Sequence, residues 1–445
     1  MLPVVTFLLL SLAGTPSHAA TTPPTVSLDL PAATELALQR SLQISAAWQG
    51  AEAAAQVVEQ VQALKRGKVG LEAEYLHLND SIGMSINLPA GLGLKLPPIV
   101  IVPQELLHAR VQAGLPLYTG NKIERAVQQA TYGAEALKAF ARDTESGVML
   151  EVSDYYLGAL LAREVVKVQQ QALDTYRQHL DQANKVFKAG VVARYDVIRA
   201  ETAVKDQEKK VSDAQNQYDL ALSALRTALV MDRDTPIELR GSLQEVSESL
   251  TLLEAQKIAL TDSDALKALD NKSLAYQMAG KVEEAGGRPQ VAAIGQVELL
   301  TGNLAATDPE WTVGVKATYD LYDGGARKAK VREQQAQQRK VETEREYAGN
   351  QIQLAIQSAY LDMGAARVGL EASHKSAELA EESLRLAQRR FEFGVGTSLE
   401  VLDATTTLAG ARVGETQSLY QLDKAWLKMH RYVGDLRAAC RRAGL

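Results

Sequence analysis

The side chains that most often perform chemistry in proteins are scarce in this sequence and do not cluster. The single cysteine, Cys440, allows neither an intramolecular disulfide nor a multi-cysteine metal site. No glycine-rich phosphate loop and no GxSxG nucleophile motif is present. Six histidines are scattered without metal-ligand spacing such as HExxH: His18, His77, His108, His179, His374 and His430. We therefore expect a protein that is not an enzyme and that uses no metal and no cofactor.

The composition indicates which elements would position any functional residue. The 445 residues are 46% hydrophobic but only 5% aromatic, and all thirteen prolines lie outside 117–235 and 310–445. This composition predicts long helices rather than a mixed globular enzyme. The formal net charge is −6. Such a balance argues against nucleic acid as a partner, because neutralising phosphates requires a clustered basic surface.

Residues 1–20 have the features of an export signal. An uncharged apolar run over residues 4–13 is followed by a glycine, a proline and a small-residue end. The run is too short to cross a bilayer as a helix. We expect cleavage after Ala19 or Ala20, export of the mature chain, and no transmembrane helix beyond residue 20.

The two halves of the chain repeat the same landmarks at an offset of 204 residues (from 117 to 321). The matched positions include 117–120 with 321–324, Tyr156 with Tyr360, and Gly190 with Gly394. A match without gaps implies elements of fixed length, which loops are not. We therefore predict a signal peptide at 1–20, a first structural repeat at 21–240 and a second at 241–445.

Each repeat contains a long helical hairpin with a coiled-coil seam. The 70 residues from Asn121 to Gly190 contain no proline and would span about 105 Å as a helix. Apolar residues seven apart mark the seam of the returning arm: Val197, Val204, Val211, Tyr218 and Leu225. We expect helical hairpins at about 121–229 and 325–435, an N-terminal helix, and a further helix at about 247–285.

The segments that precede these hairpins alternate with period two. Between residues 68 and 77, Val69, Leu71 and Tyr75 fall on one face and Lys68 and Glu72 on the other. This pattern predicts β-hairpins at about 68–117 and 290–322, although residues 290–300 alternate poorly. Amphipathic strands of this length are typical of outer membrane barrels, and also of soluble half-buried hairpins.

Four strands per chain are too few to close a membrane barrel on their own. Open strand edges cannot face lipid, because their backbone groups would lack hydrogen-bond partners. If these strands span a membrane, several chains must therefore share one barrel.

At this point the sequence resembles the TolC-like outer membrane efflux proteins. The segments 116–122 (PLYTGNK) and 320–328 (DLYDGGARK) are similar to that family's strand-to-helix junctions. The segments 187–201 and 391–411 are similar to its two helix–turn–helix tips, and 28–56 to its first helix. The likeness covers nearly the whole mature chain.

The resemblance implies a mainly α protein with a transmembrane β-barrel, assembled as a homotrimer. Twelve strands from three chains would form one barrel in the outer membrane of a Gram-negative bacterium. Long antiparallel coiled-coil hairpins would continue it as a periplasmic helical tunnel. The partners implied are outer membrane lipid, a periplasmic adaptor (membrane fusion) protein and an inner-membrane pump of RND or ABC type. The function implied is the exit duct of a tripartite pump that exports small molecules or drugs.

The resemblance also assigns candidate site residues, all near the two helix turns. The resemblance implies that the tip turns dock the adaptor. Glycine can reverse a helix tightly, and small neighbouring residues leave the backbone of the turn accessible to a partner. Relatives carry acidic rings at the pore constriction, where this chain has Glu400 and Asp403, with Asp196 at the first tip. The docking residues are Gly190, Val191, Val192 and Ala193 in the first turn and Gly394, Val395, Gly396 and Thr397 in the second.

One feature departs from the family pattern. Relatives lock the closed tip through a Tyr and an Arg near the second turn, whereas this chain has Phe391 and Gly396 at the matching positions. Arg194, Arg389 and Arg390 are the available substitutes.

Two other functions remain open. A type I protein secretion conduit uses the same architecture, and a periplasmic coiled-coil scaffold without a channel would share the helical pattern.

Overall fold

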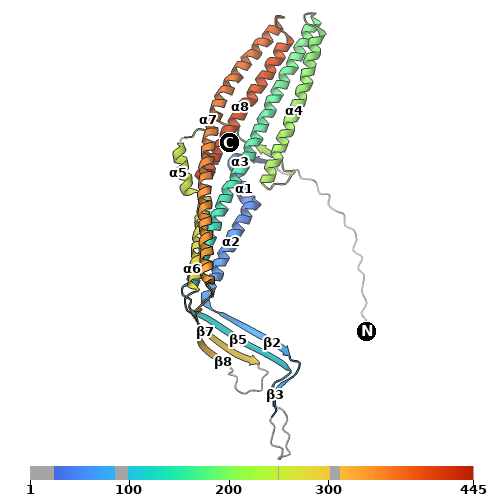
Figure 1. Cartoon of the computed structure of the whole chain (residues 1–445). Coiled ribbons are helices and arrows are strands. Elements are labelled where there is room, and N and C mark those ends of the chain that lie inside the picture. Colours follow the sequence, from blue (N-terminus) through green and yellow to red (C-terminus); the bar gives the residue numbers. More distant parts are fainter. Residues whose placement is uncertain (1–24, 86–98, 249, 301–310, 444–445) are drawn as a thin grey trace, which may run out of the picture.

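The computed structural model describes residues 25–85, 99–248, 250–300 and 311–443. The expected signal peptide at 1–20 lies outside these described residues. The chain is elongated, with two helix turns at one end and a β-sheet toward the other (Figure 1). Most of the described chain is helical, which confirms the predicted mainly α architecture.

Two helices of 67 residues each, α3 and α7, run through most of this length. At a rise of about 1.5 Å per residue, each is about 100 Å long. They begin 204 residues apart, at Lys122 and Ala326. A shorter helix returns from each of them. The bounds are α3 Lys122–Lys188, α4 Arg194–Ala228, α7 Ala326–Glu392 and α8 Ser398–Val433.

The helices form a single layer whose neighbours change along its length. In the half that ends in the turns, the order across the layer is α4, α3, α8, α7. In the half nearer the sheet, α2 packs on α3, and α6 lies between α3 and α7. The additional bounds are α2 Leu42–Ala63 and α6 Asp264–Ala285. Helices α4 and α7 are therefore the two open edges of the upper half.

We expected one continuous helix at the N-terminus and another at about 247–285, but each of these regions contains two helices. Each is divided at a serine: Ser41 separates α1 (Leu30–Arg40) from α2, and Ser263 separates α5 (Leu252–Asp262) from α6. Both serines have extended ψ angles near 120°. Each side chain accepts the backbone N–H three residues later. A serine that caps the next helix in this way interrupts the previous one.

Short elements gather around the middle of α3 and α7 and the C-terminal end of α8, and we call this region the waist. It consists of α1, α5, α9 (Leu436–Arg442) and the parallel strand pair β1 (Val26–Leu28) and β6 (Ile237–Leu239). The largest apolar cluster of the described chain lies here. Its fully buried side chains include Tyr156, Leu160, Leu225, Ile356, Leu422 and Met429.

The sheet has four antiparallel strands in the order β2, β5, β7, β8, so β2 and β8 are its edges. Residues 290–300 form a regular strand despite their poor alternation, because β7 is hydrogen-bonded to a neighbour on both sides. The pair β3–β4 extends beyond the sheet. The bounds are β2 Lys68–His77, β3 Ile82–Met84, β4 Ile99–Val102, β5 Glu105–Tyr118, β7 Gln290–Leu300 and β8 Trp311–Thr318.

The two faces of this sheet differ in chemistry. One face is apolar and solvent-exposed, and it carries Val69, Leu71, Tyr75, Leu107, Leu115, Val297, Trp311, Val313 and Val315. The other face is polar, and there Arg110 donates to Glu72 at 2.9 Å while His108 contacts Glu298 at 2.5 Å. None of the described helices combines the length and apolarity needed to cross a membrane.

Candidate functional site at the helix turns

The first turn reverses the chain between α3 and α4. Gly190 adopts a φ of +77°, which places it in the left-handed region that favours glycine. The N–H of Val191 donates to the carbonyl of Val186 at 3.2 Å, and that of Gly190 donates to Phe187 at 2.9 Å. This is a Schellman-type end of a helix. It leaves Val191 exposed, at 60% of its full accessible area.

The second turn repeats this geometry between α7 and α8. Gly394 has a φ of +71°, and the N–H of Val395 donates to the carbonyl of Arg390 at 3.0 Å. Thr397 then caps α8 by accepting the N–H of Glu400 at 3.3 Å. Val395 is 69% exposed.

The two turns lie side by side at one end of the molecule (Figure 1). A Cβ atom added to Gly394 would be 3.5 Å from Cγ1 of Val191. Together they present small and apolar side chains to solvent, while Val192 packs against the apolar cluster beneath them. The structure thus brings the eight predicted turn residues into one surface, which we call the tip surface: Gly190, Val191, Val192, Ala193, Gly394, Val395, Gly396 and Thr397.

Gly396 is held at its position by close packing. A Cβ atom there would be 2.8 Å from Cβ of Arg390 and 3.0 Å from the backbone N of Phe391. Contacts below 3.0 Å require the neighbouring atoms to move. A larger residue at this position would therefore require the end of α7 to shift.

The three predicted constriction acids have different surroundings. Glu400 accepts from Nε of Arg390 at 3.2 Å, which partly neutralises it. Asp403 is exposed and Asp196 is half-buried, and in the described part of the chain neither carboxylate forms an ion pair or a side-chain hydrogen bond. Among the three arginines considered above, Arg390 is thus the one that contacts an acid of the second turn.

The sequence analysis missed His179, which joins the two hairpins just below the turns. Its side chain comes from α3, and Nε2 lies 2.8 Å from the hydroxyl of Ser398 at the start of α8. Its ring packs edge-on against Phe391 of α7, with centroids 4.7 Å apart. Burial lowers the pKa of His179 to about 4, although the charge of Asp196 opposes this. The imidazole is therefore neutral at physiological pH.

A signal for this contact exists in the sequence. His179 falls in the same stripe of α3 as the buried residues Ala172, Tyr176 and Ala183. Tyr176 makes a similar contact, since its hydroxyl lies 2.8 Å from that of Thr406 on α8. Polar residues in an apolar helical stripe indicate hydrogen bonds across the interface, because burying them without partners is costly.

The arrangement at the turns offers a surface for contact. No group of three or more His, Cys, Asp or Glu side chains among the described residues could hold a metal ion. Cys440 lies at the waist, far along the chain from the turns, and burial raises its thiol pKa to about 11. The structure thus combines an amphipathic sheet with a long, open-edged layer of helices.

Comparison with known proteins identifies the family. The sequence model of the outer membrane efflux protein family matches residues 33–229 and 247–435. The chain therefore belongs to the outer membrane efflux protein family, whose members are channel proteins rather than enzymes.

Individual relatives are distant in sequence. Protein CyaE of Bordetella pertussis (strain Tohama I) is 26% identical over 319 residues, covering 70% of this chain and 66% of the relative. The proteases secretion protein PrtF of Dickeya chrysanthemi is 23% identical over 308 residues, covering 66% of each. The chain thus spans slightly less than two thirds of the length of these relatives. The outer membrane protein VceC of Vibrio cholerae shares the fold, with a TM-score of 0.73, 17% identity, and coverage of 91% of this chain and 96% of that one.

Proposed function

We propose that this protein is the outer membrane exit duct of a tripartite efflux pump that exports small molecules or drugs. Three copies would share one twelve-stranded barrel in the outer membrane of a Gram-negative bacterium and one periplasmic helical tunnel. The observation that carries this proposal is that a single chain leaves apolar surface uncovered. The sheet has an exposed apolar face and two open edge strands, and the helix layer has two open edges with exposed apolar side chains.

The sheet supports the membrane part of the proposal. Its apolar face exposes large side chains such as Trp311, at 67% of its full accessible area, and Val313, at 75%. A lipid environment would bury such a face, whereas water would not. The edge strands β2 and β8 each have one side without a strand partner in the sheet. Additional copies would satisfy these backbone groups, as a membrane requires.

The open edge of α7 supports the tunnel. Large exposed apolar side chains recur on the side of α7 away from its buried stripe. They fall into two runs with seven-residue spacing, which are Tyr347, Leu354, Leu361 and Val368, followed by Leu379, Leu386 and the C-cap residue Phe393. Seven-residue spacing is typical of a helix that packs against another helix. Because α8 and α6 already cover the buried stripe, the second stripe indicates a helix from another copy.

The other open edge, α4, has exposed apolar residues at matching heights. Ile198 lies four residues after the start of α4, and Leu386 six residues before the end of α7. Both are thus about 6–9 Å from the turns by helix rise. Leu220 of α4 and Val368 of α7 also lie at similar distances from the turns, about 36–39 Å by helix rise. A ring closed by α4 of one copy on α7 of the next would bury both pairs.

Cysteine cross-linking tests this assembly. With Cys440→Ala as the background, Ile198→Cys combined with Leu386→Cys is expected to give covalent dimers and trimers on oxidation in mild detergent. The control combines Leu220→Cys with Leu386→Cys, whose heights differ by about 30 Å, far beyond the reach of a disulfide. Monomers alone, equal linking in the control, or a ladder beyond three chains would contradict the proposal.

The acidic residues near the turns are proposed to line the constriction. In a trimer, three Glu400 and three Asp403 side chains would surround the axis, with Asp196 nearby. Clustered carboxylates attract cations and repel anions. Because Arg390 partly neutralises Glu400, Asp403 would supply most of the uncompensated charge.

This assignment predicts a cation-selective pore. Glu400→Gln with Asp403→Asn is expected to reduce both cation preference and block by trivalent cations added from the side of the turns, as measured by single-channel recording in planar bilayers. The control, Glu52→Gln with Glu59→Gln on α2, removes the same charge far from the turns and should change neither property. Selectivity that survives the first pair of substitutions would show that these acids do not line the pore.

The adaptor and the pump remain part of the proposal. The tip surface is proposed to dock a periplasmic adaptor protein, which links the duct to an inner-membrane pump of RND or ABC type. A second candidate function is the outer membrane component of a type I protein secretion system, which the similarity to the proteases secretion protein PrtF supports. Purifying the protein with its bound adaptor and pump would distinguish the two. A periplasmic scaffold without a channel would show no conductance.

A further inference from the structure

The two edge strands of the sheet carry charged side chains on its polar face whose bonding capacity is not used within the chain. Lys316 of β8 and Lys68 of β2 are exposed, and among the described residues neither forms an ion pair or a side-chain hydrogen bond. Glu72 of β2 accepts from Nε and Nη2 of Arg110 and from Nε2 of Gln112. All three of these bonds go to Oε2, so Oε1 is open to a further donor.

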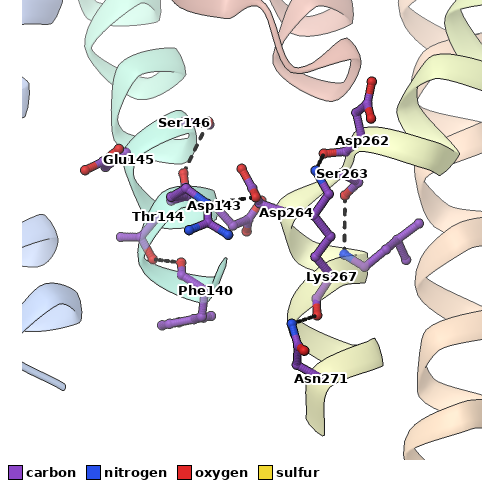
Figure 2. A network of polar contacts seen from close by, with 12 residues as sticks. Phe140, Asp143, Thr144, Glu145, Ser146, Asp262, Ser263, Asp264, Lys267 and Asn271 are labelled. Carbon is purple, nitrogen blue, oxygen red and sulfur yellow. Dashed lines mark hydrogen bonds and ion pairs between the residues drawn. The ribbon is translucent and has the colours of Figure 1, made fainter. Parts of the chain in front are cut away.

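Charged side chains at the waist, by contrast, have partners within the chain. At the α5–α6 junction, Nζ of Lys267 donates to the carbonyl of Asp262 at 2.8 Å, and Asp264 accepts from Nε of Arg142 on α3 at 3.0 Å (Figure 2). These groups lie between elements of one chain. The lysines of β2 and β8 lie instead on strands that each have one side without a neighbour in the sheet. A strand that pairs with that side would bring the missing partners.

The geometry of a barrel restricts how β8 of one copy can pair with β2 of the next. Residues directly opposite one another form rows across the sheet, such as the row from Lys68 through Gly114 and Ile294 to Gly314. Strands that close into a barrel are tilted by about 35–45°, so each row shifts along the strands as it passes around the barrel. With strands about 4.8 Å apart and about 3.3 Å of rise per residue, four strands at this tilt displace a row by about four to six residues.

The alternation of side chains and the lengths of the strands leave two registers. An odd displacement would join the polar face of one copy to the apolar face of the next, because successive side chains point to opposite faces. The row that ends at Gly314 would therefore continue at Glu72 or at Glu74 of the next copy. In both cases all eight residues of β8 lie opposite β2. A displacement in the opposite direction would carry β8 past the start of β2 and leave it unpaired.

Charge distinguishes these two registers. With a displacement of four residues, Lys316 would lie opposite Gly70, and no charged pair would form between the two strands. With a displacement of six residues, Lys316 lies opposite Glu72, whose Oε1 is open. If the pairing continued two residues beyond β8, Asp320 would lie opposite Lys68. Opposite charges directly across an antiparallel pair stabilise it, so the second register is favoured.

We propose that Lys316 of each copy pairs with Glu72 of the next copy and sets the register in which β8 joins β2. Oε2 of Glu72 would keep its bonds to Arg110 and Gln112, while Oε1 would accept from Nζ of Lys316. Three such pairs, one at each seam, would close the barrel. This inference rests on the trimer of the proposed function and adds to it the strand register and the residues that specify it.

Disulfide scanning across the seam reads the register directly. In the Cys440→Ala background, Val315→Cys is combined in turn with Leu71→Cys, Ala73→Cys or Tyr75→Cys, which face Val315 at displacements of four, six and eight residues. Residues directly opposite have Cα atoms about 4.5–5.5 Å apart, whereas a shift of two residues exceeds the roughly 7 Å that a disulfide can span. We expect covalent dimers and trimers with Ala73→Cys alone, on oxidation with copper phenanthroline in mild detergent.

The outcomes separate the register from the assembly. Electrophoresis without heating first shows whether the unmodified protein is a trimer. Trimers that link best through Leu71→Cys or Tyr75→Cys, or through none of the three positions, would overturn the register and leave the proposed assembly standing. Absence of any trimer would contradict both the assembly and the inference that rests on it.

Charge reversal tests the ion pair itself. Lys316→Glu would place two carboxylates opposite each other at three seams, so the rate at which trimers dissociate on heating is expected to rise about tenfold. Adding Glu72→Gln should restore most of the lost stability, because the amide carries no charge and its oxygen can still accept from Arg110. The matched control adds Glu74→Gln to Lys316→Glu, which makes the same change of charge two residues along β2 and should restore much less. Equal rescue by both, or trimers that Lys316→Glu leaves unchanged, would overturn the pairing.

Discussion

Replacing both Val191 and Val395 with aspartate is expected to abolish the proposed export while leaving the proposed trimer assembled. Both side chains are mostly exposed in the chain, so the folded protein should tolerate a charge at either position. A docked adaptor would bury them, and an unpaired charge in a small-residue contact carries a large desolvation penalty. The turns lie about 100 Å by helix rise from the sheet, so barrel assembly should be unaffected. Export is measured as drug tolerance of cells that depend on this protein.

The matched control is Leu253→Asp, which places the same charge on an exposed apolar residue of α5 at the waist. It should leave drug tolerance unchanged. Trimer content is checked in the same membranes by gel electrophoresis without heating. Full tolerance in cells that carry both tip substitutions would show that docking does not use the tip surface. Loss of the trimer would instead show that the turns contribute to assembly.

Asp423→Asn is expected to raise stability at pH 8 and to leave it nearly unchanged at pH 4. Burial raises the pKa of Asp423 from 3.8 to about 7 in the folded chain. The unfolded chain therefore releases this proton first as the pH rises, so stability falls between about pH 4 and pH 7 and is level above that range. The loss is at most about 4 kcal/mol, from a shift of about three pKa units. Asparagine has the same shape and cannot ionise, so it avoids this loss.

The measurement is the midpoint of thermal unfolding in detergent at pH 4 and pH 8. Asp403→Asn is the control, because Asp403 is exposed on the same helix and has no desolvation to relieve. A higher midpoint at pH 8 for Asp423→Asn alone supports the buried, neutral acid. Equal midpoints for Asp423→Asn and the unmodified chain at pH 8 would show that water or a cation already compensates the carboxylate.

The helices and their turns were predictable because their signals are local. Proline-free stretches, seven-residue apolar spacing and glycines at the reversals all act within a few turns of helix. The structure accordingly has α3 and α4 on either side of Gly190, with Val204 and Leu225 of the predicted seam buried. The divided helices at Ser41 and Ser263 were missed, because a serine inside a helical pattern becomes a cap only when packing bends the chain there.

The sequence alone therefore determined the type of protein: long helical hairpins, amphipathic strands, and turns whose glycines reverse the chain. Only the tertiary structure decided which side chains meet across the layer. His179 meets Phe391 and Ser398, and His430 lies between Glu248 and Asp435, over separations of up to 219 residues. The apolar stripe of α3 signals that His179 is buried, but no local pattern identifies the partner that either histidine meets. These contacts arise only when packing brings the two partners together in the interior, where each can satisfy the hydrogen-bonding groups of the other.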